Sequence, residues 1–279
     1  YKVHGFEDLR LHVNAGADYS TGKQTLWESP AIGSDNVYYG RYGFEKIDKY
    51  NLSLNAYAQY FKDFNENHHF DIMGGYEWQH FHRQGKSDYY GLYPETTTKT
   101  DDAGNSLAGT RYNGSGSNWK TEHYIVSFFG RANYTLLNRY LFTATVRYDG
   151  SSRFKDHWAL FPSFAFGWRI KDESFLKDVD FLSELKLRLG YGQTGQQEGI
   201  GDYNYFASYN TNVTPDSYYP ILGNGILYRP NAYNADLSWE TTTTYNAGID
   251  FGILKGKLSG SIDYYYRKTT HLINTVYVS

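Results

Sequence analysis

A glycine-rich stretch after an apolar run is the first candidate for chemistry. Gly190, Gly192 and Gly195 spell G-x-G-x-x-G in GYGQTG, and Asp216 follows about 20 residues later, as the dinucleotide-binding fingerprint asks. That fingerprint also needs a helix directly after the turn, because the helix N-terminus holds the pyrophosphate. The residues that follow, QQEGIGDYNYF, have no helical pattern. We therefore expect these glycines where a strand bends into a loop, and we predict no cofactor.

Two histidine pairs are candidates for a metal site. His80 and His82 lie two residues apart on one strand face, and His68 and His69 are adjacent. A zinc site asks for three or four ligands at defined spacings, and no third and fourth ligand shows such a spacing here. We expect these histidines near strand ends or in loops, and we predict no metal site.

Oxygen ligands gather at one turn, KTDDAGNSLAG. Asp101, Asp102 and Asn105 are suited to calcium, but the stretch lacks the length and the terminal Glu of an EF-hand loop. A solvated turn is the default interpretation, and loop-bound calcium is the alternative.

Catalytic motifs are missing from the sequence. It contains no G-x-S-x-G, no H-E-x-x-H and no P-loop. The carboxylate pair Asp172 and Glu173 has no partner that the sequence places across a cleft, as glycoside hydrolysis requires. The absence of cysteine excludes a disulfide framework, a thiolate metal site and a thiol nucleophile. We therefore predict that the protein is not an enzyme.

Aromatic residues in the long connections carry the strongest signal for binding. They alternate with Asn, Asp, Ser and Gly, so flat rings and hydrogen-bonding groups come together, which suits a glycan. Packing within the loops or against a partner protein explains the same composition equally well. The candidate residues for substrate or partner contact are Tyr89, Tyr90, Tyr93, Tyr203, Tyr205, Phe206, Tyr209, Tyr218, Tyr219 and Tyr228.

The elements that must position these residues are strands. In the segment 140–170, apolar and aromatic residues alternate with polar ones on both sides of Gly150, which predicts a β-hairpin. The same period of two recurs along the chain, and most of the runs exceed the usual strand length of about five or six residues. We predict nine strands, at 8–19, 50–61, 69–81, 122–136, 139–148, 161–170, 184–192, 237–254 and 257–269. The region 38–46 is counted as loop, with a weaker tenth strand there as the alternative.

Composition and connection lengths indicate whether the strands lie in a lipid bilayer or in water. The 279 residues include 30 Tyr, 17 Phe, 6 Trp and 28 Gly, and Tyr and Trp gather at strand ends as in an interfacial girdle. Short connections at 62–68, 137–138 and 255–256 alternate with long ones at 20–49, 82–121 and 193–236. This alternation is typical of outer-membrane barrels, which have short periplasmic turns and long external loops. A net charge of -3 with mixed signs gives no reason to expect a nucleic-acid partner.

Five blocks occur in order in the second half of the chain: RYDGSSRF (147–154), LFPSFAFGWRI (160–170), LKLRLGYGQTGQQ (185–197), LSWETTTTYNAGIDFGIL (237–254) and LSGSIDYYYRKT (258–269). With these blocks the sequence resembles the SusC/RagA family of TonB-dependent outer-membrane transporters of Bacteroidetes. The resemblance implies an all-β fold, a transmembrane antiparallel β-barrel of the 22-stranded type that encloses a plug domain. It also implies a SusD-like surface lipoprotein, energy from TonB, and import of oligosaccharides or peptides.

The chain departs from this family at both ends. No stretch near Tyr1 resembles a plug or a TonB box, and Ser279 falls where the family continues through further strands. We therefore expect residues 1–279 to be part of one barrel domain, covering about nine or ten strands, without the plug and the terminal strands. The expected location is the outer membrane, with strands in the lipid bilayer, long loops outside and short turns in the periplasm.

Two other functions remain as hypotheses. An outer-membrane barrel of this kind could serve as a scaffold for surface protein assembly and transport little. A secreted soluble β-protein is the third hypothesis, and it predicts extraction without detergent.

Overall fold

The computed structural model describes residues 2–3, 5–28, 41–93, 98, 100–113, 116–212, 227–230, 234 and 236–273. Nearly all of them lie in antiparallel strands. The nine long strands are β2 (Phe6–Glu28), β3 (Arg41–Asn65), β4 (His68–Leu92), β6 (Ser117–Leu136), β7 (Tyr140–Ser151), β8 (Trp158–Arg169), β9 (Leu182–Gln196), β12 (Glu240–Ile253) and β13 (Leu258–Thr270). The short elements are β1 (Lys2–Val3), β5 (Arg111–Asn113), β10 (Tyr209–Asn212), β11 (Leu227–Pro230) and the 3₁₀ turn η1 (Ile170–Asp172).

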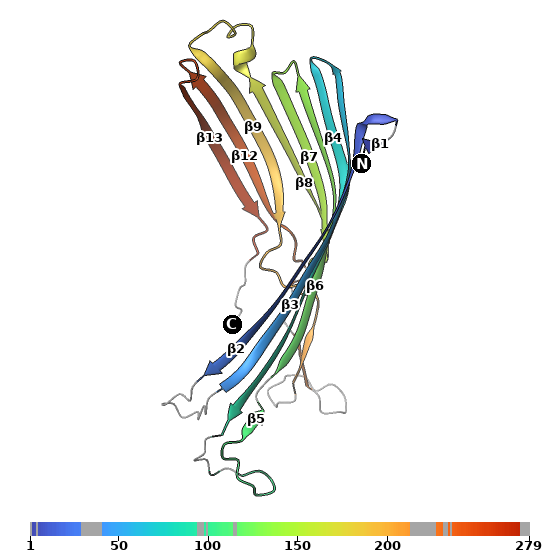
Figure 1. The fold of residues 1–279 in the computed structure, drawn as a ribbon, viewed down its shortest axis with the longest axis vertical. Helices are drawn as coiled ribbons and strands as arrows, with labels where there is room; N and C mark the ends of the chain where they lie inside the picture. The colour runs from blue at the N-terminus through green and yellow to red at the C-terminus, as the bar shows by residue number, and fades with distance from the viewer. Residues whose placement is uncertain are drawn as a thin grey trace. The chain divides into compact units, whose positions relative to one another are not determined.

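The long strands form one sheet in sequence order. Its order is β1-β2-β3-β4-β6-β7-β8-β9-β12-β13, with β5 paired to β4, while β10 and β11 pair separately (Figure 1). The nine predicted strands are confirmed, as is the all-β antiparallel class. Within the described ranges, no helix has the length and apolar character needed to cross a membrane. Contacts group the chain into two compact units, one of residues 1–15, 54–79 and 124–279, the other of 16–53 and 80–123.

Strand pairing extends further than the apolar pattern predicts. Residues 41–46, which we predicted as loop, belong to β3, and β2 and β4 continue to Glu28 and Leu92. The predicted long connections are correspondingly shorter. The physical reason is that antiparallel backbone hydrogen bonds need no apolar face, so a ladder continues where polar residues interrupt the apolar alternation. The periodicity of hydrophobic residues therefore underestimates the length of such strands.

Two rows of aromatic rings cross the strands of the first unit. In one row each ring contacts the next at centroid distances of 4.4–6.2 Å, and the row comprises Phe64, Phe70, Tyr134, Phe142 and Phe166. The second row has contacts of 4.8–6.0 Å and comprises Tyr76, Phe128, Trp158 and Tyr148. Six residues separate the rows along β4, β6 and β7, which is about 20 Å of strand. Aromatic girdles flanking an apolar band of about 25 Å have this arrangement in outer-membrane barrels.

The opposite face of the same sheet carries charged clusters. Arg188 on β9 donates to Asp250 on β12 at 2.8 Å and to Asp263 on β13 at 3.0 Å. Gly248 makes room for this cluster, because a Cβ there would lie 2.4 Å from the Asp263 carboxylate. The neighbouring residues Leu189, Ile249 and Ile262 are exposed on the other face. One face is therefore apolar and the other is hydrogen-bonded, as the alternation predicts.

A small hydrophobic cluster, here called the loop core, holds the connections at one end of these strands. It consists of Phe154, Phe161, Ile200 and Trp239, and Phe154 is completely buried. Trp239 contacts Phe154 at 4.9 Å and Phe161 at 5.6 Å between ring centroids. Gly195 is required beside it, since a Cβ there would lie 2.2 Å from the Phe161 ring. Residues from four of the sequence blocks, at positions 154, 161, 195 and 239, thus meet at this cluster.

Polar contacts fasten the loop of residues 197–206 to this loop core. The guanidinium of Arg153 donates to Asp202 at 2.8 Å and to the Gln197 carbonyl at 3.3 Å. The Arg153 and Asp202 side chains are only 17% and 7% exposed. The indole of Trp239 donates to the His157 carbonyl at 3.1 Å. The loop is therefore anchored by a largely buried ion pair as well as by apolar packing.

The connection between β8 and β9 is organised by one carboxylate. Glu173, which follows η1, accepts hydrogen bonds from Tyr140 (2.6 Å), Trp168 (2.9 Å) and Arg139 (2.8 Å). The Tyr140 and Trp168 rings also stack, with centroids 6.3 Å apart. Donation from Tyr140, then from Trp168, together with the positive charge of Arg139, lowers the pKa of Glu173 below its ordinary value of 4.5.

Acidification is expected to loosen this connection. Because the pKa of Glu173 is lower in the folded protein, its ionised form adds stability above about pH 4.5. That contribution is lost as the pH falls through the lowered folded value. Glu173→Gln should lower the unfolding temperature near neutral pH, and the gap to the wild type should narrow below pH 4. Thermal unfolding followed by tryptophan fluorescence measures this gap, and a gap that does not change with pH contradicts the assignment.

Removing the charge of Asp202 is expected to release the loop of residues 197–206. Breaking a buried pair by removing one partner costs roughly 3–5 kcal/mol, because a buried charge loses its counter-charge. We expect Asp202→Asn to approach the lower end of this range and to make the loop sensitive to limited proteolysis. The control is Lys62→Met, which breaks the half-exposed pair with Asp8 and should cost only about 0–1 kcal/mol. Equal protease sensitivity of the two variants would contradict the anchoring role.

Candidate functional site

Exposed aromatic rings stand on the anchored loop of residues 197–206 and just after it. Tyr203, Phe206 and Tyr209 are 51%, 56% and 61% exposed. Tyr205 contacts Phe206 at 4.7 Å and meets the His157 ring edge-on at 6.4 Å. The backbone is closed on itself by the Phe206 N–H, which donates to the Tyr203 carbonyl at 3.0 Å. Apolar rings are thus held in water on a backbone that is itself fixed, which favours binding by reducing the entropy lost on association.

A second aromatic group lies in the other unit. Tyr89 and Tyr90 belong to the final residues of β4, so they are strand residues and not loop residues as we predicted. Tyr90 contacts Tyr42 on β3 at 5.1 Å, and Tyr89 occupies the space beside Gly43, where a Cβ would lie 2.2 Å from its ring. Tyr93 donates its N–H to the Thr110 carbonyl at 2.9 Å. These tyrosines are partly used in packing.

Three of the candidate residues have no described side chain. Tyr218 and Tyr219 lie outside the described residues. Tyr228 belongs to β11, where its Cα is paired with that of Thr211, and nothing can be added about its ring.

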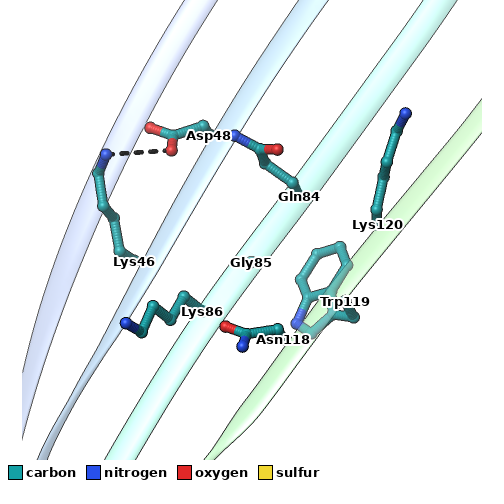
Figure 2. Close-up of a pocket in the computed structure, with 8 residues that line it drawn as sticks. All are labelled: Lys46, Asp48, Gln84, Gly85, Lys86, Asn118, Trp119 and Lys120. Atoms are coloured by element: carbon teal, nitrogen blue, oxygen red, sulfur yellow. Dashed lines mark ion pairs between the residues drawn. The ribbon is translucent and has the colours of Figure 1, made fainter.

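A pocket of about 450 Å³ opens on β3, β4 and β6 in the second unit (Figure 2). Its lining combines one indole ring, two amides, three ammonium groups and one carboxylate. These belong to Lys46, Asp48, Gln84, Gly85, Lys86, Asn118, Trp119 and Lys120. Lys46 pairs with Asp48 at 3.1 Å.

The position of the indole in this pocket depends on a glycine. A Cβ at Gly85 would lie 2.3 Å from the Trp119 ring, so only glycine lets the ring lie against β4. The guanidinium of Arg83 lies 4.9 Å from the centre of the same ring, a cation–π contact. The flat ring, the amides and the mixed charges of this pocket suit a polar ligand that also has apolar faces. Sequence reasoning missed Trp119, because it is a single ring within a predicted loop. Only its position opposite Gly85 in the sheet identifies it as a pocket residue.

The glycines of GYGQTG lie inside a strand. Gly190, Gly192 and Gly195 all belong to β9, and Gly192 pairs with Ser163 on β8 and with Thr244 on β12. Our expectation that they lie at a bend is therefore wrong: Gly190 and Gly192 are paired on both sides of the strand, and Gly195 still pairs with Thr241 on β12. Asp216 lies outside the described residues. The stretch 197–206 contains turns and no helix, so the geometry of a pyrophosphate site is absent there.

The other polar candidates are satisfied by neighbours within the protein. His68 Nδ1 lies 2.7 Å from the Tyr134 hydroxyl, and His69 Nδ1 lies 2.6 Å from Asp63. Asp101 accepts hydrogen bonds from the backbone N–H groups of Ala103 and Asn105.

The bonds to Asp101 form an Asx-type turn. The Asn105 amide adds a further bond at 2.9 Å, and donation from this residue lowers the pKa of Asp101. This geometry agrees with the default interpretation of a solvated turn.

Comparisons with known proteins place these features in a family. Residues 4–279 match the family model described as TonB dependent receptor-like, beta-barrel. The chain is 49% identical to the TonB-dependent receptor SusC of Bacteroides thetaiotaomicron over 99% of its length, and 31% identical to the TonB-dependent receptor P39 of Formosa agariphila over 84%. It spans 27% and 22% of the lengths of these two relatives.

Solved structures give the same assignment. The chain is similar to a chain in the structure of the RagAB peptide transporter, with a TM-score of 0.75 and 25% identity. The match covers 94% of this chain and 28% of that one. The similarity to the RagAB peptide importer in its open-open state has a TM-score of 0.76. The expectations of a SusC/RagA resemblance and of strands from a larger outer-membrane barrel are thereby confirmed. The chain belongs to the SusC/RagA family of TonB-dependent outer-membrane receptors, and residues 4–279 match its β-barrel.

Proposed function

We propose that the whole protein imports oligosaccharides across the outer membrane, with a SusD-like surface lipoprotein as its partner and TonB as its source of energy. Family membership supports nutrient import in general terms. The observation that supports oligosaccharides is the pair of exposed rings at Tyr203 and Phe206, held on an anchored backbone, with the exposed ring of Tyr209 just after it. An exposed ring on a backbone that is already held offers an apolar face to a sugar at a reduced cost in entropy.

The same proposal assigns parts of the protein to the barrel and to the plug. Residues 1–279 are part of one barrel domain, and the plug that contacts TonB belongs to the rest of the protein. In this arrangement the loop of residues 197–206 faces the outside of the cell. The tight turns at 66–67, 137–139 and 254–257 face the periplasm, as short turns do in outer-membrane barrels.

Peptides are the second candidate substrate. They are supported by the similarity to the RagAB peptide importer. The pocket beside Trp119 is compatible with either substrate, because its amides and charges are suited to hydroxyl groups and to peptide groups alike.

Uptake in the native cell tests both candidates. The double variant Tyr203→Ala, Phe206→Ala should raise the oligosaccharide concentration needed for half-maximal uptake about 5- to 150-fold, since two aromatic contacts of roughly 0.5–1.5 kcal/mol each are lost. The measurement is uptake of labelled oligosaccharides and, in parallel, of labelled peptides.

The matched control is Phe175→Ala, Phe181→Ala, which removes two rings of 66% and 58% exposure from the connection between β8 and β9. We expect normal uptake from this control. If the first variant selectively lost peptide uptake, peptides would replace oligosaccharides as the proposed substrate. If complete deletion of the gene left the uptake of both ligands unchanged, the proposal of transport would be overturned. The scaffold hypothesis would then remain.

A further inference from the structure

Three potential metal ligands converge in the second unit. His80 and His82 lie on β4, and Glu122 lies on the neighbouring strand β6. One nitrogen of each histidine and one carboxylate oxygen all lie within 4.8 Å of one another. The sequence predicts no metal site here because the third ligand is 40 residues away from His82 and follows a long connection. Sheet pairing alone brings it to the pair.

The distances in this cluster suit ligands around an ion. His80 Nε2 and His82 Nδ1 each lie 3.5 Å from Glu122 Oε2. A charge-assisted hydrogen bond between such groups is normally about 2.7–2.9 Å. Two ligands at about 2.05 Å from a tetrahedral zinc ion are about 3.3 Å apart. The observed spacing is therefore closer to that of two ligands sharing one ion than to that of a direct strong bond.

Burial and packing hold the two imidazoles in place. Their side chains are only 11% and 6% exposed. Tyr50 on β3 stacks on His82 at 4.3 Å and meets His80 edge-on at 5.6 Å. Fixed rings also reduce the entropy that ligand binding would cost.

One competing charge lies beside the cluster. The ammonium of Lys120 is 3.4 Å from the same oxygen of Glu122. Its side chain is 56% exposed, so it can turn towards solvent when a cation enters. Coordination of an ion by Glu122 would replace this exposed pair, which is worth only about 0–1 kcal/mol.

We propose that His80, His82 and Glu122 bind a divalent ion of the zinc class, joining β4 to β6 and leaving one coordination position open. Two imidazoles and one carboxylate are a ligand set that zinc accepts, whereas calcium and magnesium prefer oxygen ligands throughout. The fourth position is taken by water or by a donor group of a bound ligand. The site is independent of the proposed transport of oligosaccharides.

Binding of zinc to the complete, detergent-purified protein tests the site. The protein should carry an affinity tag without histidine and should be stripped with a chelator before titration by calorimetry. We expect one equivalent of zinc to bind with a Kd in the micromolar range or tighter, and magnesium not to compete. Glu122→Gln and His82→Phe should each weaken binding at least about 10-fold, since even changes outside the ligand shell cost this much. His82→Phe keeps a ring against Tyr50 and so limits the effect on folding.

His123→Phe is the matched control, because His123 is adjacent to Glu122 and its ring stacks on Phe81 at 4.6 Å. This variant should bind zinc like the wild type. Zinc should also raise the unfolding temperature of the wild type and of His123→Phe, and raise that of Glu122→Gln less at the same zinc concentration. Absence of saturable binding to the wild type, or equal affinity of wild type and Glu122→Gln, would overturn the proposal.

Discussion

Backbone hydrogen bonding in an apolar solvent is the constraint on which the rest of this structure depends. A strand in lipid must satisfy every N–H and C=O through its neighbours, because no water replaces a missing partner. The ladders that join β7, β8, β9, β12 and β13 supply such partners between neighbouring strands, with a register shift between Gly252 and Ile253 on β12. Register also decides which side chains meet lipid. A slip by one residue would carry Arg188 to the apolar face and Leu189 to the polar one.

The charged clusters on the polar face reinforce this register. Arg188 reaches Asp250 and Asp263 on two successive strands, and Arg147 on β7 reaches Glu77 on β4 at 2.9 Å and Ser127 on β6 at 2.8 Å. Each arginine thus links three strands, and its partners are aligned only in the observed pairing. Burial of charge favours one arrangement over its alternatives even where the net gain in stability is small.

The loop core explains why distant sequence blocks belong together. Phe154, Phe161 and Trp239 come from three blocks, and Gly195 from a fourth supplies the space that Phe161 fills. With the backbone held by this cluster and by the pair of Arg153 and Asp202, the rings at 203 and 206 are not needed for packing. Some residues of this loop therefore anchor it, and different residues of the same loop expose their rings to solvent. Such a division lets binding residues vary without loss of the fold.

The sequence by itself determined the strand class, the nine long strands and the family, because alternation and block order are local properties of the chain. It underestimated the length of β3 and β4, since polar residues interrupt the apolar alternation at these ends, and it therefore placed Tyr89 and Tyr90 in a loop. Only the tertiary structure decided which residues of different strands meet. Trp119 beside Gly85, and Glu122 beside His80 and His82, depend on strand neighbours and register, and no spacing within a single strand encodes them.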